Sequence, residues 1–314
     1  MFKRICIILL TILLNSNNLA KSETNNEISQ TSIVGSLTES DAFLDYKSFF
    51  NNVDDSFIIP GLTTNMCPQG LCKAKEYILI TSYDPYRNNN SCIYVLDIDT
   101  GEYKKTVWLK ENKTHVGGIT FDGEYVYIAN SCDSSLSKVL LDKIIKAEDN
   151  SIIDWELINI KNDNNKNVRA SFCVYDNKRK IVWVGTYNVI RPGYAYGYSI
   201  NDNRAELTCV MRIPRYVQGL IFDKEYIYYS LSYGSYTSSR IYKCTYNKDY
   251  NKNEIDYYSY DNIETILAPP GSENIFIHNG NLYILFESAA NCYYKNAYIP
   301  ASFDPVDRVC KYNI

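Results

Sequence analysis

One pattern recurs five times along this chain and constrains its fold more than any other feature. Each copy has a short apolar segment, a turn rich in Asp, Asn or Lys, and a second, more aromatic segment. Apolar segments of this length joined by such turns are typical of antiparallel strand pairs. The period predicts the four-stranded sheets, or blades, of a β-propeller. The copies start at Gln69, Gly117, Ser171, Gln218 and Glu273.

A third and a fourth strand are predicted after the first four pairs, but the fifth copy runs only to a third strand, at 308–312. The N-terminal segment Ser56–Pro60 resembles the predicted fourth strand Val210–Pro214, since both are apolar, end in Pro and precede a repeat. A strand taken from the N-terminus removes the unpaired edge that an open ring exposes. The sequence therefore predicts an all-β fold, a five-bladed β-propeller with four-stranded blades whose ring is closed by an N-terminal strand.

The N-terminal residues have the pattern of an export signal. Lys3 and Arg4 precede the apolar stretch Ile5–Leu14, which is too short to span a bilayer, and a polar stretch then ends at Ala20. We expect a signal peptide at 1–20 and a secreted protein. The extension at 21–54 is predicted to be partly disordered with a short helix at 40–51, and the propeller to occupy 55–314.

Composition limits the classes of partner. Without 1–20 the chain has 36 acidic and 30 basic residues, and no basic amphipathic segment, so neither nucleic acid nor a membrane surface is an expected partner. We expect a monomer. The 30 tyrosines suit half-buried strands, with ligand stacking as the alternative.

Ten cysteines are present, and nine remain once Cys6 leaves with the signal. Some should pair in an oxidising compartment, and the odd number leaves at least one unpaired. Because Cys292 follows the second strand of the fifth copy and Cys310 lies in its third, a Cys292–Cys310 disulfide is predicted. Asn89 and Asn112 begin glycosylation acceptor motifs in predicted loops. No metal site or cofactor is predicted, since Cys67 and Cys72 have no companion ligand cluster.

The first strand of each propeller blade lines the central channel, so the repeat starts identify a polar ring. Amides, hydroxyls and carboxyls in such a ring can hydrogen-bond a small hydroxylated ligand, although a water-filled channel is the simpler alternative. Glu273 and Glu287 are its carboxyl groups and are candidate catalytic acids of a carbohydrate hydrolase. The predicted ligand-binding residues are Gln69, His115, Asn130, Ser171, Gln218, Glu273 and Glu287.

The segments HVGGITFDGEYVYIAN from His115 and VQGLIFDKEYIYYSLSYGSYTSSRIYKC from Val217 resemble secreted propeller proteins of the YVTN, NHL and gluconolactonase-like kind. The resemblance implies a propeller fold, which hosts many functions. The dispersed metal-binding acids of the lactonases have no counterparts in matching places. The leading hypothesis is a secreted protein that uses one face of the propeller to bind a small polar ligand, a glycan or a protein. The alternatives are the hydrolase and a protein-interaction scaffold without a small ligand.

Overall fold

The computed structural model describes residues 43–234, 237–293 and 304–314, which belong to one compact unit, 33–314. The predicted signal peptide and the predicted disordered part of the extension lie outside the described residues. The described chain is almost entirely β-structure. None of its helices is long and apolar enough to cross a membrane.

The strands form four hydrogen-bonded sheets. One contains β2 (Cys67–Ala74), β3 (Tyr77–Tyr83), β4 (Cys92–Asp97), β5 (Tyr103–Leu109) and β9 (Ser151–Ile153). A second contains β6 (Val116–Phe121), β7 (Tyr125–Asn130), β8 (Ser135–Leu140) and β10 (Glu156–Asn159). A third has eight strands, β11 (Phe172–Asp176), β12 (Ile181–Gly185), β13 (Gly193–Asn201), β14 (Arg204–Ile213), β15 (Val217–Asp223), β16 (Tyr226–Leu231), β17 (Ser239–Lys252) and β18 (Ile255–Ala268). The last joins β19 (Ser272–His278), β20 (Asn281–Phe286), β21 (Arg308–Asn313) and β1 (Val53–Ile58). The short helices are α3 (Phe43–Phe50), α4 (Leu141–Lys146) and the 3-10 turn η1 (Asn291–Tyr293).

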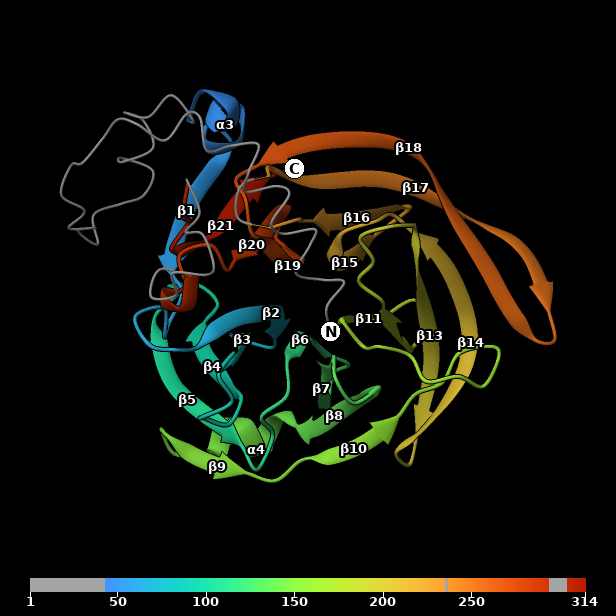
Figure 1. Ribbon diagram of the computed structural model, residues 1–314, viewed down its shortest axis with the longest axis horizontal. Coiled ribbons are helices and arrows are strands. Elements are labelled where there is room, and N and C mark those ends of the chain that lie inside the picture. Colours follow the sequence, from blue (N-terminus) through green and yellow to red (C-terminus); the bar gives the residue numbers. More distant parts are fainter. Residues whose placement is uncertain (1–42, 235–236, 294–303) are drawn as a thin grey trace, which may run out of the picture. The chain divides into compact units, whose positions relative to one another are not determined.

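The five strands that open the sequence repeats are the innermost ones (Figure 1). Each contacts the next in the order β2, β6, β11, β15 and β19, and β19 contacts β2 in turn. Gly219 shows how closely they approach, because a Cβ atom there would lie 2.8 Å from the Cα of Asn274 on β19. The innermost strands thus surround a common centre.

The N-terminal strand β1 pairs antiparallel with β21, with Phe57 opposite Val309 and Ile58 opposite Arg308. The helix expected within 40–51 is present as α3, and it packs on the same sheet. Phe49, 1% exposed, stacks on Tyr312 at 5.3 Å and meets Phe286 edge-on at 6.2 Å. Burying one such side chain contributes roughly 1.5–3 kcal/mol. The described segment 43–54 is therefore anchored to the sheet rather than separate from it.

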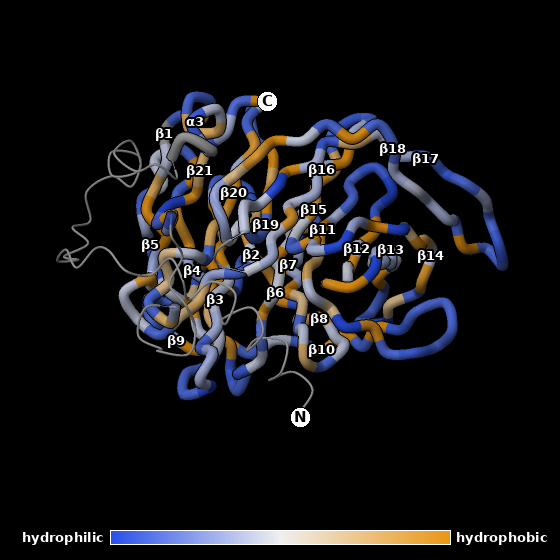
Figure 2. The backbone as a smooth tube through the Cα atoms, turned by 45° about the horizontal axis from the view of Figure 1, so that its top comes forward, coloured by the Kyte–Doolittle hydropathy of each residue, from blue (hydrophilic) through white to orange (hydrophobic). Residues whose placement is uncertain are grey.

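The innermost hairpins form where the sequence supplies turn formers between apolar strands. Asn279 and Gly280 both have positive φ, 50° and 75°, as the tight turn between β19 and β20 requires. Lys224 takes the same left-handed conformation between β15 and β16. Apolar residues follow the strands and hydrophilic residues occupy the connecting loops (Figure 2). The apolar segments read from the sequence are thus the strands that form the core, and strands such as β3, β7 and β20 are buried along nearly their whole length.

The strands β17 and β18 are far longer than the sequence predicted, at 14 residues each. Their outer ends extend to β14, where Val210 pairs with Tyr257 in a parallel arrangement. Arg179 packs over the ring of Tyr258 at 4.8 Å and forms a salt bridge with Asp176 at 2.6 Å. These contacts join β11–β14 and β15–β18 into the eight-stranded sheet.

Candidate functional site at one end of the innermost strands

Each innermost strand begins opposite the end of the second strand of its hairpin. Cys67 pairs with Tyr83, Val217 with Leu231, and Ser272 with Phe286. Because the pairing is antiparallel, the repeat starts and the polar residues that end the second strands gather at the same end of the sheets. The residue at which each repeat begins therefore determines which polar residues can meet at this end of the sheets.

The polar residues at three of these starts lie in β-bulges. The register shifts between Pro68 and Gly70, between Val217 and Gly219, and between Ser272 and Ile275. The extra residues are Gln69, Gln218 and Glu273 with its neighbour Asn274. A bulge leaves its extra residue out of the ladder and redirects its side chain, and bulges are frequent beside active sites. The repeat start at Gly117 also lies at a register shift. The start at Ser171 differs, because Ser171 precedes β11 and its Oγ accepts a hydrogen bond from the backbone amide of Tyr187 at 3.0 Å.

Glu273 and Glu287 form the centre of the site. Glu273 is 1% exposed, and Gln218 Nε2 donates to its Oε1 at 3.0 Å. The Oε2 atom of Glu287 accepts from Gln69 Nε2 at 2.6 Å and from Cys67 Sγ at 3.3 Å. Tyr293 also hydrogen-bonds Glu287. The two carboxyl groups lie within interaction distance, and a proton on one of them allows a hydrogen bond to the other.

The surroundings assign that proton. Burial, and then the charge of Glu287, raises the pKa of Glu273 well above its ordinary value. Burial also raises the pKa of Glu287, but hydrogen bonds from Tyr293, Cys67 and Gln69 oppose the rise. The surroundings therefore favour the protonated form of Glu273 and the charged form of Glu287. Two close carboxyl groups with one proton can both donate and accept.

Tyrosine side chains and His115 lie around the pair. Burial and the nearby charge of Glu287 raise the pKa values of Tyr83 and Tyr293, and burial followed by the charges of Glu273 and Glu287 raises that of Tyr187. His115 lies 4.3 Å from Tyr83 between ring centroids, and its Nδ1 is 3.0 Å from Ser131 Oγ. Burial and the charge of Arg169 lower the pKa of His115 to about 4, so its ring is neutral near pH 7.

Of the predicted ligand-binding residues, four therefore converge: Gln69, Gln218, Glu273 and Glu287. His115 and Ser171 lie at the same end, each bonded to a neighbouring strand end. Asn130 instead makes its hydrogen bonds within its own sheet and the preceding loop, to Asn112, Thr114, Ser135 and Ser137. Cys67 and Tyr293 are the residues whose contact with the acids was not predicted. The only sequence signal for Cys67 is its position two residues before a repeat start.

Two predictions about modification are corrected. Asn112 is 2% exposed, and its Nδ2 donates to Asn130 Oδ1 at 3.3 Å, so it is not accessible as a glycan acceptor in the folded chain. Cys292 and Cys310 are both unpaired and lie in different core clusters. The pairing register explains this, since Cys310 lies opposite Ile284, well before the end of β20. Asn89 is exposed, and its glycosylation remains a prediction.

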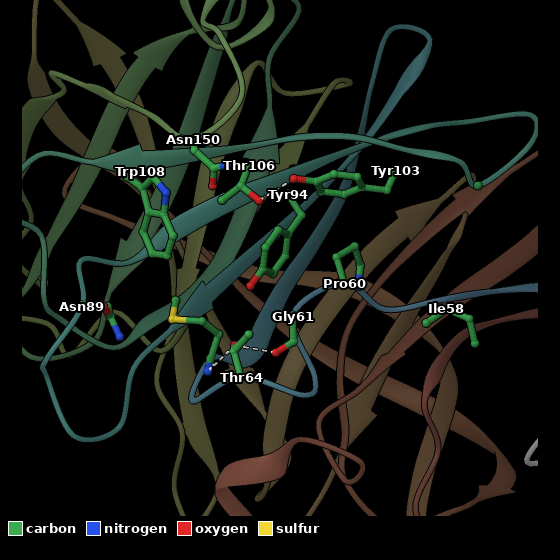
Figure 3. Close-up of a pocket in the computed structure, with 12 residues that line it drawn as sticks. Ile58, Pro60, Gly61, Thr64, Asn89, Tyr94, Tyr103, Thr106, Trp108 and Asn150 are labelled. Carbon is green, nitrogen blue, oxygen red and sulfur yellow. Dashed lines mark hydrogen bonds between the residues drawn. The ribbon is translucent and has the colours of Figure 1, made fainter. Parts of the chain in front are cut away.

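A separate cavity of about 780 Å³ lies beside β4 and β5, away from the carboxyl pair. Tyr94 faces it between Trp108 and Pro60 in Figure 3. Its polar wall includes the hydrogen bond between Tyr103 and Thr106. The sequence analysis did not identify this cavity, because its walls come from the outer strands and from the loop after β1. The described residues contain no cluster of three or more metal-ligating side chains.

Comparisons with known proteins identify the fold. The sequence matches no model of a known protein family and no curated protein. Among solved structures it is similar to Myxococcus xanthus glutaminyl cyclase, with a TM-score of 0.50 and 10% identity over 82% of this chain and 94% of that one. It is also similar to the aldose sugar dehydrogenase of Streptomyces coelicolor in its PQQ-bound form, with a TM-score of 0.47 and 12% identity over 82% and 98%.

A third similar structure, the Kuenenia stuttgartiensis hydrazine synthase, has a TM-score of 0.41 and 10% identity, and the match covers 72% of this chain and 58% of that one. At these identities the likeness concerns the fold alone. The sequence prediction of a propeller is confirmed at that level, while the particular family stays a prediction. The chain has a β-propeller fold.

Proposed function

We propose that this chain is a secreted recognition protein that binds a small amine-bearing molecule at the Glu273–Glu287 pair. The observation that carries the proposal is the approach of two carboxyl groups at the head of the innermost strands, where the burial of Glu273 and the donors around Glu287 favour a single proton on the pair. The pair then keeps one negative charge in a largely buried setting. Tyrosine rings beside that charge favour a cation, because their faces attract positive charge. A protonated amine can pair with the negative charge of the carboxyl groups and also lie against the tyrosine rings.

The scaffold in this proposal is a ring of five blades. The eight-stranded sheet then counts as two blades, β11–β14 and β15–β18. Only their outermost strands, β14 and β18, pair with each other and join the two halves. The pairing of β1 with β21 supports closure by the N-terminal strand, and the cyclic contacts of the innermost strands support a count of five. Secretion is supported by the export pattern at 1–20. N-terminal sequencing of protein collected from the medium of expressing cells tests it, since retention inside the cell contradicts it.

A thermal-shift screen tests the ligand class. The probes are free amino acids, short peptides and amino sugars, each compared with its N-acetylated form, and neutral sugars. A ligand at 100 times its dissociation constant adds about 2.7 kcal/mol, or roughly 5 °C for a domain of this size. We expect the amines to stabilise the protein and their acetylated forms not to.

Substitution locates the binding site. Glu287→Gln removes the negative charge and is expected to abolish the shift, while Glu206→Gln, at an exposed glutamate on β14, is expected to leave it unchanged. Equal shifts with amines and neutral sugars contradict the proposed ligand class. If no probe shifts the melting temperature, a protein-interaction scaffold without a small ligand is favoured instead.

A second candidate is a proton-transfer enzyme, because the pair can accept one proton while it donates another. Carbohydrate hydrolysis is not favoured, since directly hydrogen-bonded carboxyl groups are closer than the roughly 5 Å that retaining glycosidases need. Cyclisation of an N-terminal glutamine, named for the Myxococcus xanthus structure, takes a proton from the amine and gives one to the departing ammonia. Ammonia release from glutaminyl peptides, lost in Glu273→Gln and in Glu287→Gln, supports this activity, and no release excludes it.

A further inference from the structure

Cys67 is a buried thiol in contact with the carboxyl pair. It opens β2, is fully buried, and donates to Glu287 Oε2 at 3.3 Å. Its sulfur also lies 3.6 Å from Gln69 Nε2 and 3.8 Å from the Tyr293 hydroxyl. It therefore lies on the wall of the site as well as in the core.

Cys292 is the second thiol at this place. It lies in η1, just after β20, is 4% exposed, and belongs to the same core cluster as Cys67. Its side chain interacts with the thiol of Cys67, and the hydroxyl of the adjacent residue Tyr293 lies 3.8 Å from the Cys67 sulfur. The other buried cysteine considered for pairing, Cys310, lies in a different cluster.

The backbone holds these two segments together independently of the thiols. The amide of Asn291 donates to the Leu62 carbonyl at 2.9 Å, and Asn291 Nδ2 donates to the Thr63 carbonyl at 3.0 Å. Both acceptors lie in the loop that leads into Cys67. One backbone and one side-chain hydrogen bond therefore hold the turn that contains Cys292 beside the segment that leads into Cys67, and a disulfide requires such proximity of its two cysteines.

We propose that Cys67 and Cys292 are a disulfide-forming pair that covalently joins β2 to the turn after β20. The oxidant is a low-molecular-weight disulfide such as oxidised glutathione. The thiolate of one cysteine attacks the glutathione disulfide and releases one glutathione. The second cysteine then attacks the mixed disulfide, which forms the Cys67–Cys292 bond and releases the other glutathione. The two cysteine thiols lose their protons and two electrons, and both end on the two released glutathione molecules as thiols.

The bond has two consequences. It links the start of the first repeat to the turn after β20 in the last repeat, and so fastens the sheet of β2 to the sheet of β19 and β20. It also removes the S–H group that donates to Glu287, so that carboxylate keeps only Gln69, Tyr293 and Glu273 as donors. The second consequence rests on the proposed ligand site, while the first does not.

Disulfide mapping tests the pair directly. The purified wild-type chain is incubated with mixtures of reduced and oxidised glutathione, free thiols are blocked with N-ethylmaleimide after denaturation, and the chain is digested without reduction. We expect mass spectrometry to find the Cys67 and Cys292 peptides joined, with two hydrogen atoms lost, in most molecules under oxidising conditions. Both thiols blocked, or either one joined to another cysteine, overturns the proposal.

Variants separate this result from misfolding and from the ligand proposal. Cys292→Ala, a small change at a buried position of η1, is expected to leave Cys67 free to react with maleimide after denaturation, and Cys132→Ser, at an exposed cysteine, is expected to keep the bond. Because mapping uses no ligand, the disulfide stands or fails independently of amine binding. If amines bind, affinity is expected to differ between oxidised and reduced wild type and not in Cys292→Ala. Equal affinities then refute only the effect on the site.

Discussion

Replacing Glu273 with glutamine tests whether the carboxyl pair holds a proton. Glutamine has nearly the same shape as a protonated glutamate and donates a hydrogen bond without titrating. In Glu273→Gln the amide can therefore donate to Glu287 as the protonated carboxyl does, while Gln218 stays beside it. The variant therefore keeps the site at every pH in the form that the wild type has when Glu273 is protonated.

The expected effect depends on pH and has a definite sign. The pKa of Glu273 is raised well above its value in an unfolded chain, about 4.3, so the folded state binds the proton more tightly. This stabilisation is complete below pH 4 and is lost as pH rises toward the folded-state pKa. The maximal slope for one proton is about 1.4 kcal/mol per pH unit. Between pH 5 and 7 the wild type should lose up to about 2.7 kcal/mol that the variant keeps.

Urea unfolding at pH 5, 6, 7 and 8 measures the difference. We expect Glu273→Gln to have nearly the stability of the wild type at pH 5 and to exceed it by roughly 2–3 kcal/mol at pH 7. In melting temperature this is about 5 °C. The control Glu206→Gln should follow the wild type at every pH. If the plots of unfolding free energy against pH run parallel for Glu273→Gln and the wild type, Glu273 does not hold a proton, and the assignment of the negative charge to Glu287 is refuted as well.

Three further predictions follow from single sites. His115→Gln should remove an acid-induced loss of stability of up to about 3 kcal/mol, because the depressed pKa of His115 makes the wild type lose stability as pH falls from 6.5 toward 4. Urea unfolding of both proteins at pH 6.5 and pH 4 measures this loss, and equal acid sensitivity of variant and wild type contradicts the prediction. Gly219→Ala should lower stability by about 1–3 kcal/mol in thermal unfolding, because the added Cβ meets backbone on β19, and wild-type stability would refute the close approach of β15 and β19. Cys132, the exposed one among the nine described cysteines, should be the first to react with maleimide in the native protein, as read by peptide mass spectrometry, and faster labelling of any buried cysteine would contradict the packing.

The sequence was sufficient to place most strands because burial and turn chemistry agree in each repeat. It failed at β17 and β18, where polar residues such as Asn251 and Lys252 alternate with tyrosines and resemble a loop. The end of β17 pairs with β18, and β18 in turn pairs with β14, a contact between segments far apart in the sequence. Local pattern contains no information on such a partner.

The candidate site was predictable in part for the same reason. The repeat phase fixes the end of the sheets at which Gln69, Gln218, Glu273 and Glu287 gather. It does not fix which hydrogen bonds they make, and Asn130 shows the difference, since its amide bonds its own sheet. The contact of Tyr293 with Glu287 depends on the turn η1 after β20, and the contact of Cys67 with Glu287 depends on packing between the first and last repeats. No pattern within one repeat reports that packing.

The placement of the two glutamines explains how two acids can be tolerated together. Glu273 on β19 has β15 on one side and β2 on the other, and each neighbour supplies an amide, Gln218 to Glu273 and Gln69 to Glu287. A third acid at either position would add repulsion, and an apolar residue would leave a buried carboxyl oxygen without a donor. The equivalent positions on the remaining repeats, Gly117 and Ser171, are small. The repeated hairpins therefore supply equivalent positions, and the residue at each one confines the two acids and their amides to the neighbouring repeats that contain β15, β19 and β2, which gives the one-sided charge that the proposed site for one small cation requires.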